Sequence, residues 1–313
     1  AKLQFECGKS SPLFSVNFDV DDFDEFDLIK IVFSIFAKFG LNESFEISNE
    51  QLFHFLRGIR EKYKKVPFKN WRHSIDVFQF VSCQIIDGKL DKIFTKEQVL
   101  ALLIASLCHD ATGDYFENEI MNFSMEDDYL LSRNCGYSEV ANLLNSISVL
   151  SSEKSNILMS VDSARSKQIL ETVVDLILST NMSLHFTILN KFLNLLNSGE
   201  LNVDDNEQHK LFLMKIVIKC GDLCSIVRPF EIAKKRFGFI ADDFYRCGEI
   251  ERAIGVVFKS SEMKREEVKK DESLVGFMKS VALPLFQALS KQIDSLSVYV
   301  EKINENIRKC EKN

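Results

Sequence analysis

The sequence predicts an all-α fold, arranged as one compact domain of many helices. The chain has 313 residues but only 12 Gly and 4 Pro, so it lacks the turn formers that a sheet-rich fold requires. Apolar residues recur at three- and four-residue spacing along many segments, which is typical of helices that bury one face. No internal repeat or low-complexity linker divides the chain, so residues 1–313 are expected to form a single domain.

The first two helices are indicated by an apolar stripe and by a cap. The stripe lies within Phe23–Phe39 and consists of Phe26, Ile29, Val32, Phe33 and Phe36. A second helix is expected after Ser48, because a serine followed three residues later by Gln51 is the pattern of a capping box.

Further helices are expected along the rest of the chain. Their predicted ranges are residues 71–86, 96–108, 138–147, 163–179, 182–197, 208–228, 242–255 and 273–307. Pro284 is expected to kink or divide the last of them, because proline lacks the N–H group that a helix interior uses. The 27 phenylalanines are expected to fill the core, since aromatic bulk is mostly buried.

Charge and cysteine usage exclude several classes of function. The net charge is −7, which disfavours nucleic-acid binding because that function needs a basic face. The eight cysteines contain no CxxC pair, and no signal peptide is visible, so we expect a reducing, cytoplasmic setting. The apolar runs in the sequence indicate no segment that approaches the length of a bilayer span, and no membrane span is expected.

Four residues carry the chemistry that the sequence suggests. His73 lies in a predicted helix, His109 and Asp110 end the apolar segment Val99–Cys108, and Asp222 follows another apolar segment. Imidazole nitrogens and carboxylate oxygens suit a divalent metal such as Zn, Mg, Mn or Fe. The alternative is that each is an isolated buried polar residue satisfied by hydrogen bonds. Two aspartates beside long apolar helices favour the metal, because an uncompensated buried carboxylate is costly.

The order His…His-Asp…Asp resembles the HD-type metal phosphohydrolases, and the flanking residues resemble the cyclic-nucleotide phosphodiesterases. The resemblance covers about residues 66–290, with residues 1–65 as N-terminal helices and 291–313 as a C-terminal helix. The matching motifs, in chain order, are Asn70-Trp71-Arg72-His73, Leu107-Cys108-His109-Asp110, Ser148-Val149-Leu150, Thr180-Asn181-Met182 with His185, Asp222-Leu223, Arg228-Pro229-Phe230, Asp243-Phe244-Tyr245 with Gly248 and Glu251, Val275-Gly276-Phe277 and Leu283-Pro284-Leu285.

The resemblance implies the helical fold of this family and a metal site within it. His73, His109, Asp110 and Asp222 would hold a first metal, Zn in the family, and Asp110 would bridge to a second, Mg or Mn. A metal-bound hydroxide would then attack a cyclic nucleotide. Phe277 would stack on the nucleotide base.

Several positions depart from the pattern of that family. The histidine that protonates the leaving oxygen is replaced by Lys69, and lysine, with an ordinary pKa of about 10.4, is a poorly matched proton donor. The purine-reading glutamine aligns with Leu274, which has no hydrogen-bonding group. The other replacements lie around the metal site and the base site: Gly113 for a histidine, Ser151 for a glutamate, Glu153-Lys154 for a histidine pair, Asn181 for an aspartate and Ser225 for an asparagine.

These departures favour a pseudoenzyme, weakly active or inactive, that serves as a structural or protein-interaction subunit. One alternative is an active but divergent metal-dependent hydrolase of a cyclic nucleotide or another phosphoester, because all four first-metal residues remain. The other alternative is a nucleotide-binding sensor that keeps Phe277 but has no turnover.

Overall fold

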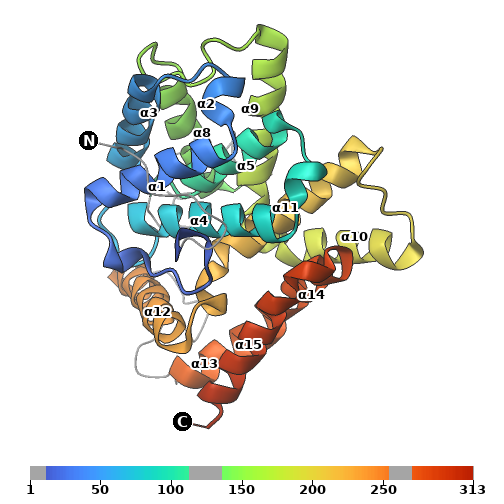
Figure 1. Cartoon of the computed structure of the whole chain (residues 1–313). Coiled ribbons are helices and arrows are strands. Elements are labelled where there is room, and N and C mark those ends of the chain that lie inside the picture. Colours follow the sequence, from blue (N-terminus) through green and yellow to red (C-terminus); the bar gives the residue numbers. More distant parts are fainter. Residues whose placement is uncertain (1–11, 113–135, 254–269, 313) are drawn as a thin grey trace.

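The computed structural model describes residues 12–112, 136–253 and 270–312, and it is shown in Figure 1. Of the residues in those three ranges 77% are helical and none lies in a strand, so the all-α prediction is confirmed. The domain boundaries remain a prediction. The α-helices are α1 (Glu25–Lys38), α2 (Leu41–Ser44), α3 (Asn49–Lys62), α4 (Trp71–Asp87), α5 (Lys96–Cys108), α8 (Tyr137–Leu150), α9 (Ser163–Ser179), α10 (His185–Ser198), α11 (Glu207–Asp222), α12 (Phe230–Ala253), α13 (Lys270–Phe277), α14 (Leu283–Gln292) and α15 (Ser297–Cys310).

Short 3₁₀ segments and one π-helical segment connect these helices. The 3₁₀ segments are η1 (Pro12–Phe14), η2 (Val20–Asp22), η3 (Leu90–Lys92), η4 (Met182–Leu184), η5 (Cys224–Val227) and η8 (Asp294–Leu296), and the π-helix is η7 (Met278–Ala282).

Side-chain caps fix where the central helices begin. The predicted capping box of α3 is present, since Ser48 accepts from the backbone of Gln51 and the Gln51 side chain accepts from the backbone of Ser48. Thr95 and Gln98 form the same arrangement at α5. Asn70 caps α4 by accepting from two backbone N–H groups. Such caps satisfy N–H groups that the first turn of a helix leaves without partners.

The core is built around α4 and α5. Every residue from Val99 to Cys108 in α5 is buried, and α4 packs against α1, α5 and α11. Phenylalanine fills much of this core, as predicted: Phe33, Phe36, Phe55, Phe78, Phe80, Phe192 and Phe286 are almost completely inaccessible to solvent. In Figure 1, α4 crosses the middle of the molecule, while α13, α14 and α15 lie in its lower part, with α13 near the C-terminus and α14 to the right.

Two predicted helix boundaries were wrong. The segment predicted as 208–228 is α11, which ends at Asp222, followed by η5. The helix predicted to start at 242 is α12, which begins at Phe230. Pro229 directly precedes it, and a proline with its fixed φ is readily placed at the start of a helix. Pro229 is therefore a signal in the sequence for the start of α12, although the predicted range began only at residue 242.

The helix does not break at Pro284, where the sequence analysis expected a kink or a division. The helical segment continues from Asp271 to Gln292, and the break comes after it, at Ile293. The π-helical turn Met278–Ala282 immediately precedes α14, which has Pro284 in its first turn. A wider turn accommodates the missing N–H group and the bulk of the ring.

By length and composition alone, Asp271–Gln292 is the one described helix that could cross a membrane, and the sequence pattern did not indicate it. The bent pair Ser163–Ser179 and Met182–Ser198 would pass the same test if counted as one span. Within the Asp271–Gln292 segment, Leu274, Met278 and Leu285 belong to the hydrophobic core of the domain.

Gly221 allows a close approach between α11 and α4. A Cβ atom at this position would lie 2.5 Å from Cγ2 of Val81, much closer than two carbon atoms can pack. The glycine therefore sets the distance between these two helices next to Asp222.

Candidate metal centre

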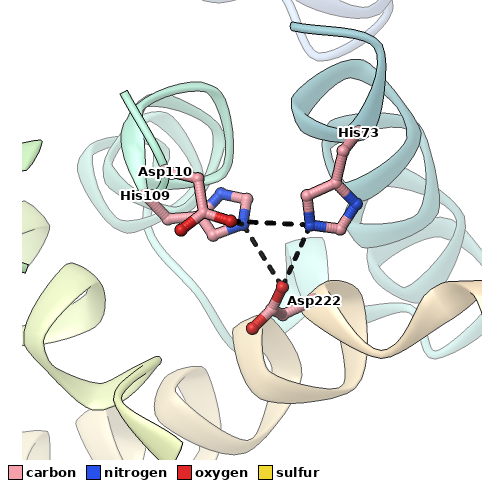
Figure 2. A group of neighbouring side chains, drawn as sticks. All are labelled: His73, His109, Asp110 and Asp222. Atoms are coloured by element: carbon pink, nitrogen blue, oxygen red, sulfur yellow. Dashed lines mark hydrogen bonds and ion pairs between the residues drawn. The ribbon is translucent and has the colours of Figure 1, made fainter. Parts of the chain in front are cut away.

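Four side chains from three helices converge at the centre of the fold. His73 comes from the first turn of α4, His109 and Asp110 directly follow α5, and Asp222 is the last residue of α11. One ligand atom from each lies within 4.8 Å of every other. Figure 2 shows both imidazole rings and the Asp110 carboxylate grouped around Asp222. The structure thus brings together the four residues that the sequence singled out.

The distances among these atoms suit one metal ion. Asp222 Oδ1 lies 3.2 Å from His73 Nε2 and 3.3 Å from His109 Nε2. Asp110 Oδ2 lies 3.4 Å from His109 Nε2 and 3.8 Å from His73 Nε2. A cation with bonds of about 2.0–2.2 Å holds neighbouring ligands about 2.8–3.6 Å apart. Three of the four separations fall in that range.

Two of the ligand atoms have no hydrogen-bond partner. His109 Nε2 and Asp110 Oδ2 are buried side-chain atoms without one among the described residues. A buried polar atom left without a partner costs about 1–3 kcal/mol. A divalent cation bound to these atoms would remove that cost, so the residues fit a metal ion.

The loop before α4 positions His73. Asn70 Oδ1 accepts from the backbone N–H of His73 at 3.1 Å, and its Nδ2 donates to the carbonyl of Val66 at 2.9 Å. The Phe68 ring packs against the His73 ring with centroids 4.3 Å apart. The backbone N–H of Phe68 in turn donates to the buried carboxylate of Asp243 at 3.0 Å.

The end of α5 is held in place by backbone and side-chain contacts. His109 Nδ1 lies 3.0 Å from the carbonyl oxygen of Ser106. A carbonyl only accepts, so Nδ1 carries the proton and Nε2 presents its lone pair to the cluster. Asn142 of α8 donates to the carbonyl of His109 and accepts from the side chain of Thr112 at 2.9 Å.

The electrostatics of the cluster keep both carboxylates ionised. Burial acts to raise the pKa of Asp222, but the neighbouring imidazoles of His109 and His73 outweigh burial and lower the pKa well below its ordinary value. Burial likewise acts to raise the pKa of Asp110, and the Lys69 ammonium and His109 outweigh it, so the net pKa is lowered. Ionised carboxylates are the form that binds a cation.

The pKa of His109 is raised, whereas those of the two aspartates are lowered. Burial acts to lower its pKa, but the charges of Asp110 and Asp222 outweigh burial and raise it. A proton therefore competes with a metal ion for this imidazole, and metal uptake would release it.

Lys69 contacts the cluster from outside. Its Nζ donates to Asp110 Oδ1 at 2.7 Å, on the oxygen that does not face the histidines. The Lys69 side chain is 22% exposed and that of Asp110 is 6% exposed. The sequence placed Lys69 near the site by its adjacency to Asn70, but only the structure reveals its ion pair.

The predicted base-binding residues lie on α13, at the bottom of the molecule in Figure 1, near the C-terminus. Leu274 is 2% exposed and belongs to the hydrophobic core. Phe277 is half-buried, packs against the core and lies near the Phe237 ring, with centroids 6.5 Å apart.

The remaining replaced positions have varied surroundings. Asn181 is buried, and its Nδ2 donates to Glu139 at 3.3 Å. Ser225 is buried in η5, whereas Ser151, Glu153 and Lys154 are exposed after the end of α8. Gly113 lies outside the described residues.

One buried ion pair near the site was not predicted from the sequence. Arg228 is 0% exposed, and its Nη2 donates to Asp76 Oδ1 and to Gln79 Oε1, each at 2.6 Å. Asp76 and Gln79 lie on α4, one and two turns beyond His73. The helical spacing of His73, Asp76 and Gln79 is visible in the sequence, but the distant Arg228 could not be paired with them.

The fold and the cluster together define an all-helical domain with a candidate site for a divalent metal ion. A family model described as 3'5'-cyclic nucleotide phosphodiesterase matches residues 68–303. The chain therefore belongs to the 3',5'-cyclic-nucleotide phosphodiesterase family.

The curated proteins that the chain is similar to include cyclic phosphodiesterases. The cGMP-specific 3',5'-cyclic phosphodiesterase of Drosophila melanogaster is 27% identical over 307 residues, which are 96% of this chain and 27% of that protein. The protein of the same name from Drosophila pseudoobscura pseudoobscura has the same identity over the same length. The chain thus spans about a quarter of the length of these relatives.

The solved structures show a likeness of fold. The phosphodiesterase domain of the RhoPDE fusion protein from the choanoflagellate Salpingoeca rosetta superposes with a TM-score of 0.91 at 24% identity, covering 97% of this chain and 96% of that chain. The structure of LmjPDEB1 in complex with IBMX superposes with a TM-score of 0.90 at 23% identity, covering 98% and 94%.

Proposed function

We propose that this domain is a pseudo-phosphodiesterase. It keeps a metal centre at His73, His109, Asp110 and Asp222, hydrolyses cyclic nucleotides slowly or not at all, and acts as a structural or protein-binding subunit in the cytoplasm. The observation that carries the proposal is the ion pair between Lys69 and Asp110.

A metal ion at this site would provide only part of the chemistry of phosphoester hydrolysis, and protein residues must provide the rest. A divalent cation bound here would lower the pKa of a bound water and stabilise negative charge on a phosphate. Breaking the phosphoester bond also requires a proton for the leaving oxygen. The Lys69 ammonium lies at the site but is engaged by Asp110 at 2.7 Å. Donating its proton would leave a neutral amine beside a buried carboxylate, which disfavours the transfer.

The residues at the positions expected to bind the nucleotide base support the same proposal. A purine edge needs hydrogen-bonding partners, and an unpaired one loses affinity. Leu274 stands at the expected reading position and is 2% exposed, so it offers neither a polar group nor contact area. Phe277 keeps an aromatic face, half-buried against the core, which favours weak stacking over specific recognition.

The cytoplasmic setting is supported by the cysteines. Cys83, Cys108, Cys220, Cys224 and Cys310 are free and buried. Burial raises the pKa of the Cys83 thiol to about 12, so it behaves as an unreactive apolar side chain.

One observation favours the alternative of an active, divergent hydrolase. All four ligand residues are close together, and both aspartates are held ionised. A complete first metal site is what metal-assisted hydrolysis needs first. The sensor alternative is supported by Phe277 alone.

The test is a metal analysis combined with an activity assay. We expect the purified domain to hold a divalent metal and to hydrolyse cyclic AMP and cyclic GMP, with Mg²⁺ or Mn²⁺ added, at least about 10²-fold more slowly than an enzyme with its general acid. A Lys69→His variant is assayed in parallel, and Lys215→His serves as its control because Lys215 also pairs with an aspartate, Asp175, at 2.6 Å.

Rapid hydrolysis by the wild type that is lost in Asp222→Ala would overturn the proposal and establish the hydrolase. Micromolar nucleotide binding without turnover would favour the sensor.

A further inference from the structure

We propose that the Lys69 ammonium takes the place of a second metal ion on Asp110, so that this centre holds one metal ion beside a built-in positive charge. The inference concerns the number of ions bound. It holds whether or not the domain turns over cyclic nucleotides, and its test measures no activity.

The two oxygens of Asp110 have different partners. Oδ2 faces the two histidines, 3.4 Å from His109 Nε2 and 3.8 Å from His73 Nε2. Oδ1 accepts from Lys69 Nζ at 2.7 Å. A carboxylate can bridge two cations by giving one oxygen to each. Here one oxygen is directed to the metal site, and an ammonium occupies the other.

The loop around Lys69 is anchored on both sides of its position. The side chain of Asn70 donates to the carbonyls of Val66 at 2.9 Å and Pro67 at 3.1 Å. The backbone N–H of Phe68 donates to Asp243 at 3.0 Å, and Asp243 is 0% exposed. These contacts fix the backbone from which Lys69 extends, so the ammonium is delivered to Asp110 by an ordered segment.

Charge repulsion makes the ammonium and a second metal ion mutually exclusive. A metal ion bound to Oδ1 would lie about 2.0–2.2 Å from that oxygen, and the ammonium is already 2.7 Å from it. Two positive centres this close repel each other strongly, the more so because Asp110 is 6% exposed and water screens the site poorly.

The charge count favours the same arrangement. With neutral histidines, the two aspartates carry two negative charges, which one divalent ion neutralises. Lys69 then leaves the five side chains and the ion with one net positive charge. A second divalent ion beside Lys69 would raise that to three, which is unfavourable for a group of largely buried residues.

The experiment counts bound Mn²⁺ ions directly. Purified wild-type domain is stripped of metal and titrated with MnCl₂, and free Mn²⁺ is measured from its electron paramagnetic resonance signal. The variants are Lys69→Met and Lys69→Gln, which remove the charge, and Lys69→Arg, which keeps it. Lys215→Met is the matched control, since its ion pair with Asp175 is 2.6 Å long and Lys215 is 18% exposed.

We expect one Mn²⁺ per chain in the wild type, in Lys69→Arg and in Lys215→Met, and two per chain in Lys69→Met and Lys69→Gln. Two ions that share a carboxylate lie about 3.5–4 Å apart. The second ion should therefore broaden the signal of the first through magnetic coupling, which separates a shared site on Asp110 from adventitious binding elsewhere.

Two ions in the wild type, or none, would overturn the proposal. So would a single ion in both neutral variants when their helical content, measured by circular dichroism, matches that of the wild type. A second ion without magnetic coupling would also overturn it, because that ion would not be bound to Asp110.

Discussion

Two buried charged clusters each include residues of α4, and they are neutralised in different ways. The metal cluster consists of His73, His109, Asp110 and Asp222. The arginine cluster consists of Asp76, Gln79 and Arg228. His73 and Asp76 are one helical turn apart on α4, and Asp222 and Arg228 flank η5.

The arginine cluster contains its own cation. Arg228 donates to Asp76 and Gln79, and its guanidinium lies 5.4 Å from the Phe18 ring centroid and 5.3 Å from that of Phe80. Asp110 and Asp222, by contrast, share one ammonium and two imidazoles, and Asp110 Oδ2 has no hydrogen-bond partner in the described chain. The comparison shows that similar burial of carboxylates leads to a closed structural pair in one place and to a candidate ion site in the other.

The largest expected effect comes from opening the arginine cluster. Arg228→Met should lower the free energy of unfolding by about 3–5 kcal/mol, because it leaves the Asp76 carboxylate buried without its cation. Urea denaturation measures this. The double variant Arg228→Met/Asp76→Asn should recover part of the loss, and a loss below about 1 kcal/mol in the single variant would contradict the assigned pairing.

A smaller effect should follow from emptying the metal cluster. At a free metal concentration about 100 times the dissociation constant, a bound ion adds about 2.7 kcal/mol to stability. Chelation with EDTA should therefore lower the melting temperature of the wild type but not that of Asp222→Asn. Asp204→Asn, in an exposed loop, should behave as the wild type, and an EDTA response in Asp222→Asn would count against the site.

The smallest effect concerns a third buried group, His185. Its neighbouring charge is the ammonium of Lys219, whereas the histidines of the metal cluster lie beside carboxylates. Burial, assisted by the Lys219 ammonium, lowers the pKa of His185 from 6.5 to about 4. The folded state thus binds this proton less readily than the unfolded chain. The free energy of unfolding should fall by about 1–3 kcal/mol as the pH is lowered from about 6.5 toward 4.

Urea titrations at pH 7 and pH 4.5 measure the His185 effect. His185→Gln should reduce the difference between the two pH values, while His54→Gln, at a less buried position on α3, should leave it unchanged. An equal pH dependence in the wild type and in His185→Gln would refute the assignment.

The sequence predicted the parts of this structure that depend on local pattern. A capping box gave the start of α3, and the predicted ranges of α4 and α5 agree with the structure to within one residue. The four residues of the metal cluster were also found, because histidines and aspartates beside strongly apolar helices are costly to bury unless a cation compensates them. Their convergence to within 4.8 Å then agrees with that prediction of a shared site.

Contacts between distant segments could not be predicted in the same way. The pair of Lys69 with Asp110 joins residues 41 positions apart, and that of Arg228 with Asp76 joins residues 152 positions apart. The spacing of residues along the sequence does not indicate which carboxylate oxygen accepts a hydrogen bond from a distant lysine. The π-helical turn before Pro284 was missed for a related reason, since the sequence marks the proline but not the way in which the helix absorbs it.

Gly221 has a consequence for how this domain can change through mutation. A methyl group at this position would collide with Val81 of α4, so the turn that ends in Asp222 is constrained by helix packing whatever happens to the metal. Substitutions that abolish metal binding can accumulate at His109 or Asp222 without relaxing the demand for glycine. The backbone geometry around Asp222 can therefore be retained after metal binding has been lost, because the packing of α4 against α11 requires it.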